Sequence, residues 1–149
     1  MSAHVVTELL ACRCEQLFDL AADIERYPDY LPGWQSARIV ERAGNRLRVE
    51  QQLGLPLFGH SFVSTALLER PDRVTVQSND GPFGKLHIEW RFERVAQERC
   101  RISLSLEYQL TSHALKLVAD QLFQVAAADV IERFKTRAQI LYGCRTIME

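Results

Sequence analysis

Histidines, serines and cysteines are the residues of this chain whose types would support acid-base or nucleophilic chemistry. Nucleophilic catalysis requires a Ser or Cys beside an oriented base, and the available histidines are His4, His60, His87 and His113. Only His60 lies near the apolar end of the expected sheet, and a lone histidine in a strand is more often structural than catalytic. No G-x-S-x-G, phosphate-loop or H-E-x-x-H pattern is present, so the sequence predicts no catalytic residue.

Charged residues at helical spacing form two further groups. We interpret the first as the solvated face of a short helix rather than a metal site or an acid-base pair; it consists of Glu15, Asp19, Asp23 and Glu25. Arg133 and Arg137 are four residues apart and interrupt the apolar stripe of a long helix. Because Arg137 lies roughly 36 Å from the start of that helix, we expect a structural ion pair with an acidic residue rather than a contact with a ligand head.

The four cysteines do not form a recognisable metal or redox motif. Cys12 and Cys14 make one C-x-C pair, whereas Cys100 and Cys144 stand alone and no histidine cluster is nearby. A zinc site or a C-x-x-C redox centre therefore finds no support. We expect reduced thiols, no metal site and no cofactor.

Hydrophobic periodicity predicts the elements that position these residues. A β-rich segment at 5–7 precedes a short helix over 15–24, in which Leu17, Leu20 and Ile24 share one face. Pro28 and Pro32 bracket the next three residues. They leave room only for a turn or a second short helix.

From about residue 34 to residue 110 the apolar period changes to two. Every other residue of 100–110 is apolar, and 86–92 alternates in the same way, which predicts strands with one wet face. Weaker alternation occupies 34–42, 46–53, 60–69 and 73–78. Short turn-like connections between the runs favour an antiparallel meander.

The last element is a helix of roughly 30 residues that Ser112 can cap and that ends near Gly143. Its apolar stripe can lie across the apolar face of the sheet and runs through Leu115, Ala119, Leu122, Phe123, Ala126, Val130, Phe134 and Leu141. A curved antiparallel sheet packed on one long helix gives an α+β fold.

The meander separates the connections into two ends of different character. The connections at 43–45, 70–72 and 96–99 share a charged end, which we interpret as ordinary solvated surface. The opposite end collects 53–59, 81–84, the 27–34 connection and the start of the long helix, and it is apolar. Apolar loops favour a binding mouth or contact surface; the alternative is that they plug the end of the sheet. The residues concerned are exposed in the first case and buried in the second: Leu55, Leu57, Phe58 and Phe83.

Small and polar side chains on the inner face of the sheet would leave a cavity between sheet and helix. We expect this inner set to include some of Gln51, Ser64, Thr65, Ala66, Gln77 and Ser78; for most of them the sequence favours an outward direction equally. Such a cavity suits an elongated apolar ligand with a polar head.

Composition limits the class of protein. The chain has 149 residues, 18 basic and 19 acidic, for a net charge of −1, which indicates one domain over 1–149 without general affinity for DNA or other nucleic acids. The 47% hydrophobic content excludes intrinsic disorder. No apolar run approaches the roughly 18 residues of a membrane span. We expect a cytoplasmic protein that at most contacts the inner face of the membrane.

An ordered set of motifs, spread over nearly the whole chain, resembles the coenzyme Q-binding, START-like family within the polyketide cyclase/dehydrase and lipid transport superfamily. The set comprises Leu17-Phe18-Asp19-Leu20, the run from Asp23 to Pro32, Ala37-Arg38, Gly81-Pro82-Phe83 followed by Leu86, Trp90 and Phe92, and finally Phe134, Arg137-Ala138 and Leu141-Tyr142-Gly143. Two departures are that Gly33 precedes Trp34, where the family usually has Trp directly after Leu-Pro, and that Ala11 replaces a usual Pro. The group includes bacterial ribosome association toxins, oligoketide cyclases and lipid transport proteins.

The resemblance implies a helix-grip fold whose cavity holds a hydrophobic ligand, with ubiquinone the expected one. It implies non-enzymatic binding or chaperoning of a polyprenyl quinone in support of respiration. The resemblance and the apolar end together identify the candidate ligand-binding residues. These are Tyr27, Trp34, Leu53, Leu55, Leu57, Phe58, Phe62, Phe83, Trp90, Leu122, Phe123, Ala126 and Val130.

Two other functions remain open. The family names allow a protein that binds the large ribosomal subunit and blocks subunit association, although a near-zero net charge gives it no electrostatic support. A polyketide cyclase or aromatase would need an acid or base in the cavity, for which His60 and Tyr108 are the candidates. One fold carries all three functions, so the fold does not decide between them.

Overall fold

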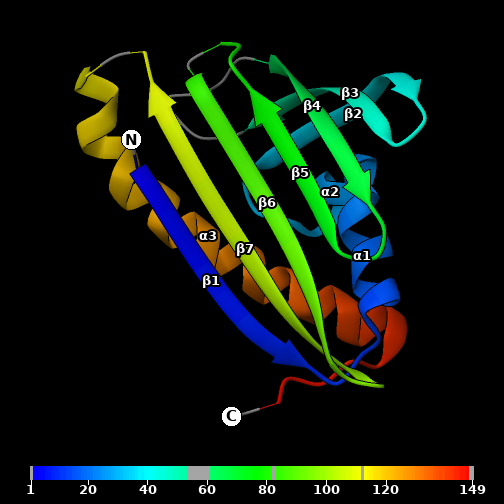
Figure 1. Cartoon of the computed structure of the whole chain (residues 1–149). Helices are drawn as coiled ribbons and strands as arrows, with labels where there is room; N and C mark the ends of the chain where they lie inside the picture. Colours follow the sequence, from blue (N-terminus) through cyan, green and yellow to red (C-terminus); the bar gives the residue numbers. More distant parts are fainter. Residues whose placement is uncertain (1, 54–60, 82, 112, 148–149) are drawn as a thin grey trace.

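The computed structural model describes the backbone of residues 2–53, 61–81, 83–111 and 113–147, and of these the side chains of all but 2–3, 53 and 113–126. Over these residues one antiparallel sheet has the strand order β1-β7-β6-β5-β4-β3-β2 (Figure 1). The strands are β1 (Ser2–Leu10), β2 (Trp34–Ala43), β3 (Arg46–Leu53), β4 (Ser61–Glu69), β5 (Arg73–Ser78), β6 (Phe83–Ala96) and β7 (Arg99–Leu110). The meander predicted from 34 to 110 is confirmed, and β1 pairs with β7 to complete the sheet.

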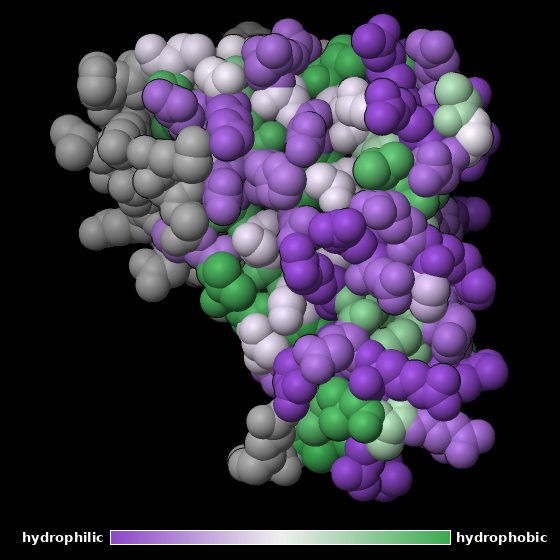
Figure 2. Space-filling view, in the orientation of Figure 1, coloured by the Kyte–Doolittle hydropathy of each residue, from purple (hydrophilic) through white to green (hydrophobic). Residues whose placement is uncertain are grey.

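Alternation places one set of side chains of each strand under the sheet. In β7, Ile102, Leu104 and Leu106 are buried, and in the neighbouring β6 so are Trp90 and Phe92. The residues between them point to the outer face, where hydrophilic side chains prevail (Figure 2). Burial of every second residue on one side is the physical reason why this part of the chain folds as strands with a single wet face.

The helices cover the inner face of the sheet. The first of them, α1 (Cys14–Ala22), leads through the 3₁₀ turn η1 (Ile24–Arg26) into the second short helix, α2 (Tyr27–Tyr30). This helix contains Pro28 in its first turn, where a proline is tolerated, and ends before Pro32. The long helix α3 (His113–Tyr142) has 30 residues and runs behind β1 and β7 in Figure 1. It ends as predicted at Gly143, whose φ of +70° lets its N–H reach the carbonyl oxygen of Gln139 at 2.9 Å.

The core lies between α3, α1 and the sheet. From the described part of α3, Val130, Ile131 and Phe134 enter it, and Phe134 packs on Trp90 with ring centroids 4.6 Å apart. The expectation that Leu141 belongs to the apolar stripe is wrong, because its side chain is 49% exposed. The core contact of this last turn is Ala138, which is fully buried.

All four cysteines are paired, which contradicts the expectation of reduced thiols. Cys12 is bonded to Cys144, and Cys14 to Cys100. The residues after α3 return to the end of β1, where the backbone N–H of Ala11 donates to the carbonyl of Arg145. This return brings partners 132 and 86 residues apart in sequence into contact. Spacing along the chain does not reveal such a contact.

No helix within the described residues is long and apolar enough to cross a membrane.

Candidate functional site

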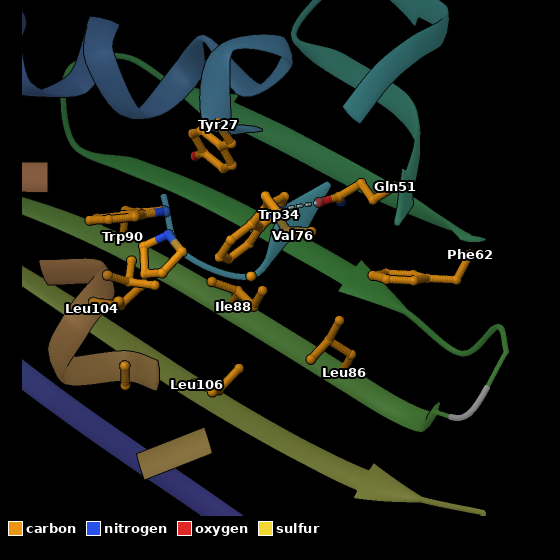
Figure 3. A pocket seen from close by; sticks show the side chains of 14 residues that line it. Tyr27, Trp34, Gln51, Phe62, Val76, Leu86, Ile88, Trp90, Leu104 and Leu106 are labelled. Atoms are coloured by element: carbon orange, nitrogen blue, oxygen red, sulfur yellow. Dashed lines mark hydrogen bonds between the residues drawn. The ribbon is translucent and has the colours of Figure 1, made fainter. Parts of the chain in front are cut away.

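A cavity of about 70 Å³ lies between the inner face of the sheet, α3 and the connection from α2 to β2 (Figure 3). Strands β3 to β7 supply most of its wall, and α3 contributes Ala127 and Val130. Apolar side chains dominate the described lining, which consists of Tyr27, Pro32, Gly33, Trp34, Gln51, Phe62, Val76, Leu86, Ile88, Trp90, Leu104, Leu106, Ala127 and Val130. The site is therefore an apolar recess in the core.

Three aromatic residues form one wall of the cavity. The rings of Tyr27 and Trp34 meet edge to face with centroids 5.6 Å apart, and Trp90 lies beside them in the lining (Figure 3). The Tyr27 hydroxyl donates a hydrogen bond to the carbonyl oxygen of Ala21. Burial raises the pKa of Tyr27 well above its ordinary value of 10.0, and the nearby Tyr30 raises it further. A hydrogen bond from the Trp90 indole acts in the opposite direction and is weaker than burial. This tyrosine is therefore neutral at physiological pH.

Trp34 reaches the cavity through the backbone conformation of the residue before it. Gly33 has φ of +88°, a left-handed conformation that side chains with a Cβ rarely adopt. This turn carries the chain from Leu31, the C-cap of α2, into β2. The extra glycine that departs from the family pattern thus leaves the indole in the wall of the cavity.

Two buried polar side chains extend from Trp34 along the sheet. The indole Nε1 of Trp34 donates to Oε1 of Gln51 at 2.8 Å, and Nε2 of Gln51 donates to Oγ of Ser64 at 2.6 Å. Gln51 and Ser64 are buried, as is Ala66, so these three members of the candidate inner set do face inward. Thr65 and Gln77 are exposed on the outer face instead.

The described lining contains no carboxylate, histidine, lysine or arginine. Its one titratable group is Tyr27, whose raised pKa keeps it neutral. The described residues also include no group of three or more His, Cys, Asp or Glu that could hold a metal ion. The lining within the described part of the chain suits apolar binding and includes no acid-base pair.

The predicted ion pair of Arg137 is not what the structure shows. The Arg137 guanidinium carbon lies 5.5 Å from the ring centroid of Tyr30, a cation–π contact between α3 and α2. Arg137 Nε and the Tyr30 hydroxyl are both buried and have no hydrogen-bond partner among the described residues. Helical spacing identified the arginine as inward-facing, but the aromatic partner comes from a segment about 100 residues earlier.

The structure places five of the candidate ligand-binding residues in the wall of the cavity: Tyr27, Trp34, Phe62, Trp90 and Val130. Phe83 is not among the described lining; it is 1% exposed and packs edge to face on Phe62 at 5.3 Å. The alternative in which Phe83 is exposed at a binding mouth is therefore wrong. Strand β6 begins at this residue, and its side chain packs on the inner face of the sheet.

The remaining candidate residues fall outside what can be described. Leu55, Leu57 and Phe58, with the possible acid-base residue His60, lie outside the described residues. The backbones of β3 and α3 include the others, whose side chains are not described: Leu53, Leu122, Phe123 and Ala126. The other acid-base candidate, Tyr108, is 1% exposed, stacks on His4 and is not in the described lining.

Sequence reasoning missed several residues of the wall. Leu86, Ile88, Leu104 and Leu106 belong to the two clearest alternating runs, so their inward direction was predictable from the pattern. Ala127 is the neighbour of Ala126 and lies just outside the apolar stripe predicted for the long helix, so the helical spacing did not identify it. In a close-packed core, space for a cavity is left beside small side chains such as this one.

Comparison with known proteins places this fold and cavity in a family. Ribosome association toxin RatA of Escherichia coli K12 is 29% identical over 139 residues, which cover 93% of this chain and 88% of that protein. Coenzyme Q-binding protein COQ10 homolog B, a mitochondrial protein of Xenopus laevis, is 22% identical over 92% of this chain and 58% of its own length.

Solved structures share the architecture. A START superfamily protein from Mycobacterium smegmatis superposes with a TM-score of 0.74 at 15% identity, covering 95% of this chain and 99% of that one. The START-like fold expected from the motifs is thereby confirmed. The family model described as polyketide cyclase / dehydrase and lipid transport matches residues 11–135. The chain belongs to the polyketide cyclase / dehydrase and lipid transport family.

Proposed function

We propose that this protein binds and carries a hydrophobic ligand without altering it chemically, and that a polyprenyl quinone such as ubiquinone, handled in support of respiration, is the first candidate. The observation that carries the proposal is the apolar cavity between α3 and the sheet. The name of the Xenopus relative, a coenzyme Q-binding protein, supports the choice of ligand.

The absence of an acid-base pair from the described lining supports binding rather than catalysis. A cyclase needs a group that gives or takes a proton near neutral pH. Tyr27 is poorly suited to this, because burial raises its pKa and its hydroxyl is held by the Ala21 carbonyl.

Binding would draw its free energy from burial of apolar surface. At roughly 25 cal/mol per Å², a few isoprene units supply several kcal/mol before ordering costs are subtracted. The cavity of about 70 Å³ holds only a few waters, since one water needs about 10–15 Å³. Because ligand pockets typically measure several hundred Å³, we expect the walls to separate when a quinone enters.

Mass spectrometry tests the proposal directly. Protein purified from cells without refolding is extracted with solvent, and the extract is analysed for quinones and other lipids. We expect a quinone or a lipid in near-stoichiometric amount, and saturable binding of added decylubiquinone to the emptied protein. Recovery of neither, together with no saturable binding, would refute the proposal.

Association with the ribosome is a second candidate function, favoured by the name of the Escherichia coli relative. The exposed arginines of the outer face do not form a purely basic surface, because Glu41 lies opposite Arg48, and Arg38 pairs with Glu50 at 3.7 Å. Sucrose-gradient sedimentation decides the matter. Comigration with the large subunit and reduced subunit joining would support this function, whereas free protein at every moderate salt concentration would eliminate it.

The place of action in the cell is a separate part of the proposal. We place the protein in the cytoplasm, at the inner face of the membrane, where a carrier would meet quinones. Disulfide bonds such as the two seen here are rare in reducing compartments. Alkylation of thiols in intact cells, followed by mass spectrometry, tests the point. Four alkylated cysteines would place the protein in the cytoplasm, with the two bonds forming only on oxidation after lysis, whereas cysteines that escape alkylation would place it in an oxidising compartment.

A further inference from the structure

Gln51 differs from the other described residues that line the cavity because its side chain is an amide. It comes from β3, is only 3% exposed, and lies in a lining made largely of apolar side chains. Burying a polar group in such surroundings costs free energy unless its hydrogen bonds are made. What Gln51 bonds to is therefore informative about the ligand.

The two neighbours of Gln51 determine which way its amide points. The indole N–H of Trp34 can only donate, so the atom facing it at 2.8 Å must be the carbonyl oxygen Oε1. Nε2 then faces Ser64, to whose Oγ it donates at 2.6 Å, and Ser64 in turn donates to the carbonyl of Val49 at 3.4 Å. The amide is held at both ends, and Figure 3 shows it beside Trp34 at the cavity wall.

In this arrangement one N–H of the Gln51 amide has no acceptor among the described residues. An amide nitrogen carries two hydrogens, and among the described residues Nε2 of Gln51 has one partner, Ser64. The other acceptor side chains of the described lining are already engaged. The Tyr27 oxygen accepts from the Trp90 indole while its hydrogen goes to the Ala21 carbonyl, and Oε1 of Gln51 accepts the Trp34 hydrogen. A bound molecule with an acceptor oxygen would satisfy the second hydrogen of the Gln51 amide.

We propose that Gln51 recognises the head group of the ligand by donating its second amide hydrogen to a carbonyl oxygen, and that this head group carries no charge. This inference rests on the proposed function of ligand carriage and deepens it by naming the head-group chemistry. The described lining contains no Arg or Lys to balance a carboxylate and no carboxylate to balance an ammonium. Unpaired charges are costly to bury, so fatty acids and charged lipid heads are disfavoured.

The test compares two ring compounds that share one carbon skeleton: menadione, which carries two carbonyls, and 2-methylnaphthalene, which carries none. Gln51→Met keeps an unbranched side chain of similar length and removes the donor. We expect this variant to bind menadione about tenfold more weakly, the effect of losing one hydrogen bond, and to bind 2-methylnaphthalene within about twofold of the wild type. Gln77→Met, on the exposed outer face, is the matched control and should change neither affinity.

A second measurement needs no variant and therefore does not depend on whether Gln51→Met folds. Infrared spectra of menadione bound to the wild-type protein should show one carbonyl stretching band shifted to lower frequency relative to menadione in a hydrocarbon solvent. An unshifted band, or equal weakening of both probes by Gln51→Met, would overturn the role of Gln51 while leaving ligand carriage intact. A wild-type protein that binds neither probe and carries no lipid would overturn both.

Discussion

At the wall of the cavity, the backbone conformation of Gly33 positions the side chain of Trp34. Gly33 turns the chain with a positive φ, and Trp34 then enters β2 with its indole directed at Gln51. Nothing lies within 4 Å of where a Cβ on Gly33 would sit. The requirement for glycine at this position is therefore conformational and not a matter of space.

Gly33→Ala should lower the free energy of unfolding by about 1–2 kcal/mol, the cost of a left-handed conformation for a residue with a Cβ. Gly84→Ala is the matched control, because Gly84 has no positive φ and the nearest heavy atom to its added Cβ lies at 3.6 Å. Urea denaturation of both variants measures the difference. Equal stability of the two variants would contradict the conformational explanation.

The neighbouring tyrosines 27 and 30 differ in how their hydroxyls are satisfied. Tyr27→Phe should destabilise by about 1 kcal/mol or more, because it removes a buried hydrogen bond to the Ala21 carbonyl. Tyr30→Phe should stay within about 0.5 kcal/mol of the wild type or increase stability, since the Tyr30 hydroxyl is buried without a partner among the described residues. The aromatic ring that contacts the Arg137 guanidinium is kept in this variant. Thermal or urea unfolding compares them; a larger loss for Tyr30→Phe would refute this assignment.

At the scale of elements, the ends of the chain are joined where β1 meets the segment after α3. Leu10 and Thr146 form a β-bridge, and the Cys12–Cys144 bond lies directly beside it. The second bond joins Cys14, the first residue of α1, to Cys100 in β7. Helix α3 is thus anchored at its C-terminal end to the edge strand that it crosses.

Peptide mapping without reductant should recover both bonds. Trypsin cuts after Arg13 and so separates Cys12 from Cys14, which makes the two pairings distinguishable by mass. Reduction should lower the free energy of unfolding by about 2–4 kcal/mol for each bond, because each closes a long loop. Four alkylatable thiols in folded protein purified in air without reductant, or unchanged stability on reduction, would contradict the pairing.

At the scale of the whole molecule, the sheet and α3 enclose a space that the side chains do not fill, and binding should depend on it. Ala127→Leu should fill the cavity and weaken decylubiquinone binding at least about tenfold, at a stability cost of about 1–3 kcal/mol or less if the cavity accepts the new side chain. Ala128→Leu makes the same chemical change at the next, exposed position of α3 and should bind as the wild type does. Fluorescence titration measures both; equal affinities would place the ligand elsewhere.

The stability of the molecule should also fall at high pH. Burial raises the pKa of Tyr27 and Tyr30 above the ordinary value of 10.0. Above about pH 10 the unfolded chain releases these protons while the folded chain retains them, so the contribution of the two tyrosines is complete below pH 10 and is lost as pH rises through the folded-state values. Urea unfolding between about pH 9 and pH 11 should show this decline. The Tyr27→Phe/Tyr30→Phe double variant should show a shallower one, and an equal slope would refute the assignment.

What the sequence by itself determined is the order and type of the elements, because alternation at period two and apolar spacing along a helix are local properties. The strands from 34 to 110, the long helix ending at Gly143 and the inward sets around Trp90 and Leu104 follow from these patterns. The motifs around Asp23 to Pro32 indicated the family that residues 11–135 match.

Only the tertiary structure decided which distant residues meet. Gln51 shares the inner face with Leu47 and Val49, but its bond to Trp34 depends on the turn at Gly33 and on the register of β2 against β3. The cysteine pairs and the Arg137–Tyr30 contact join residues about 90 to 130 positions apart. Such contacts are set by how the sheet curves around α3 and returns the chain to β1, and no local pattern encodes that closure.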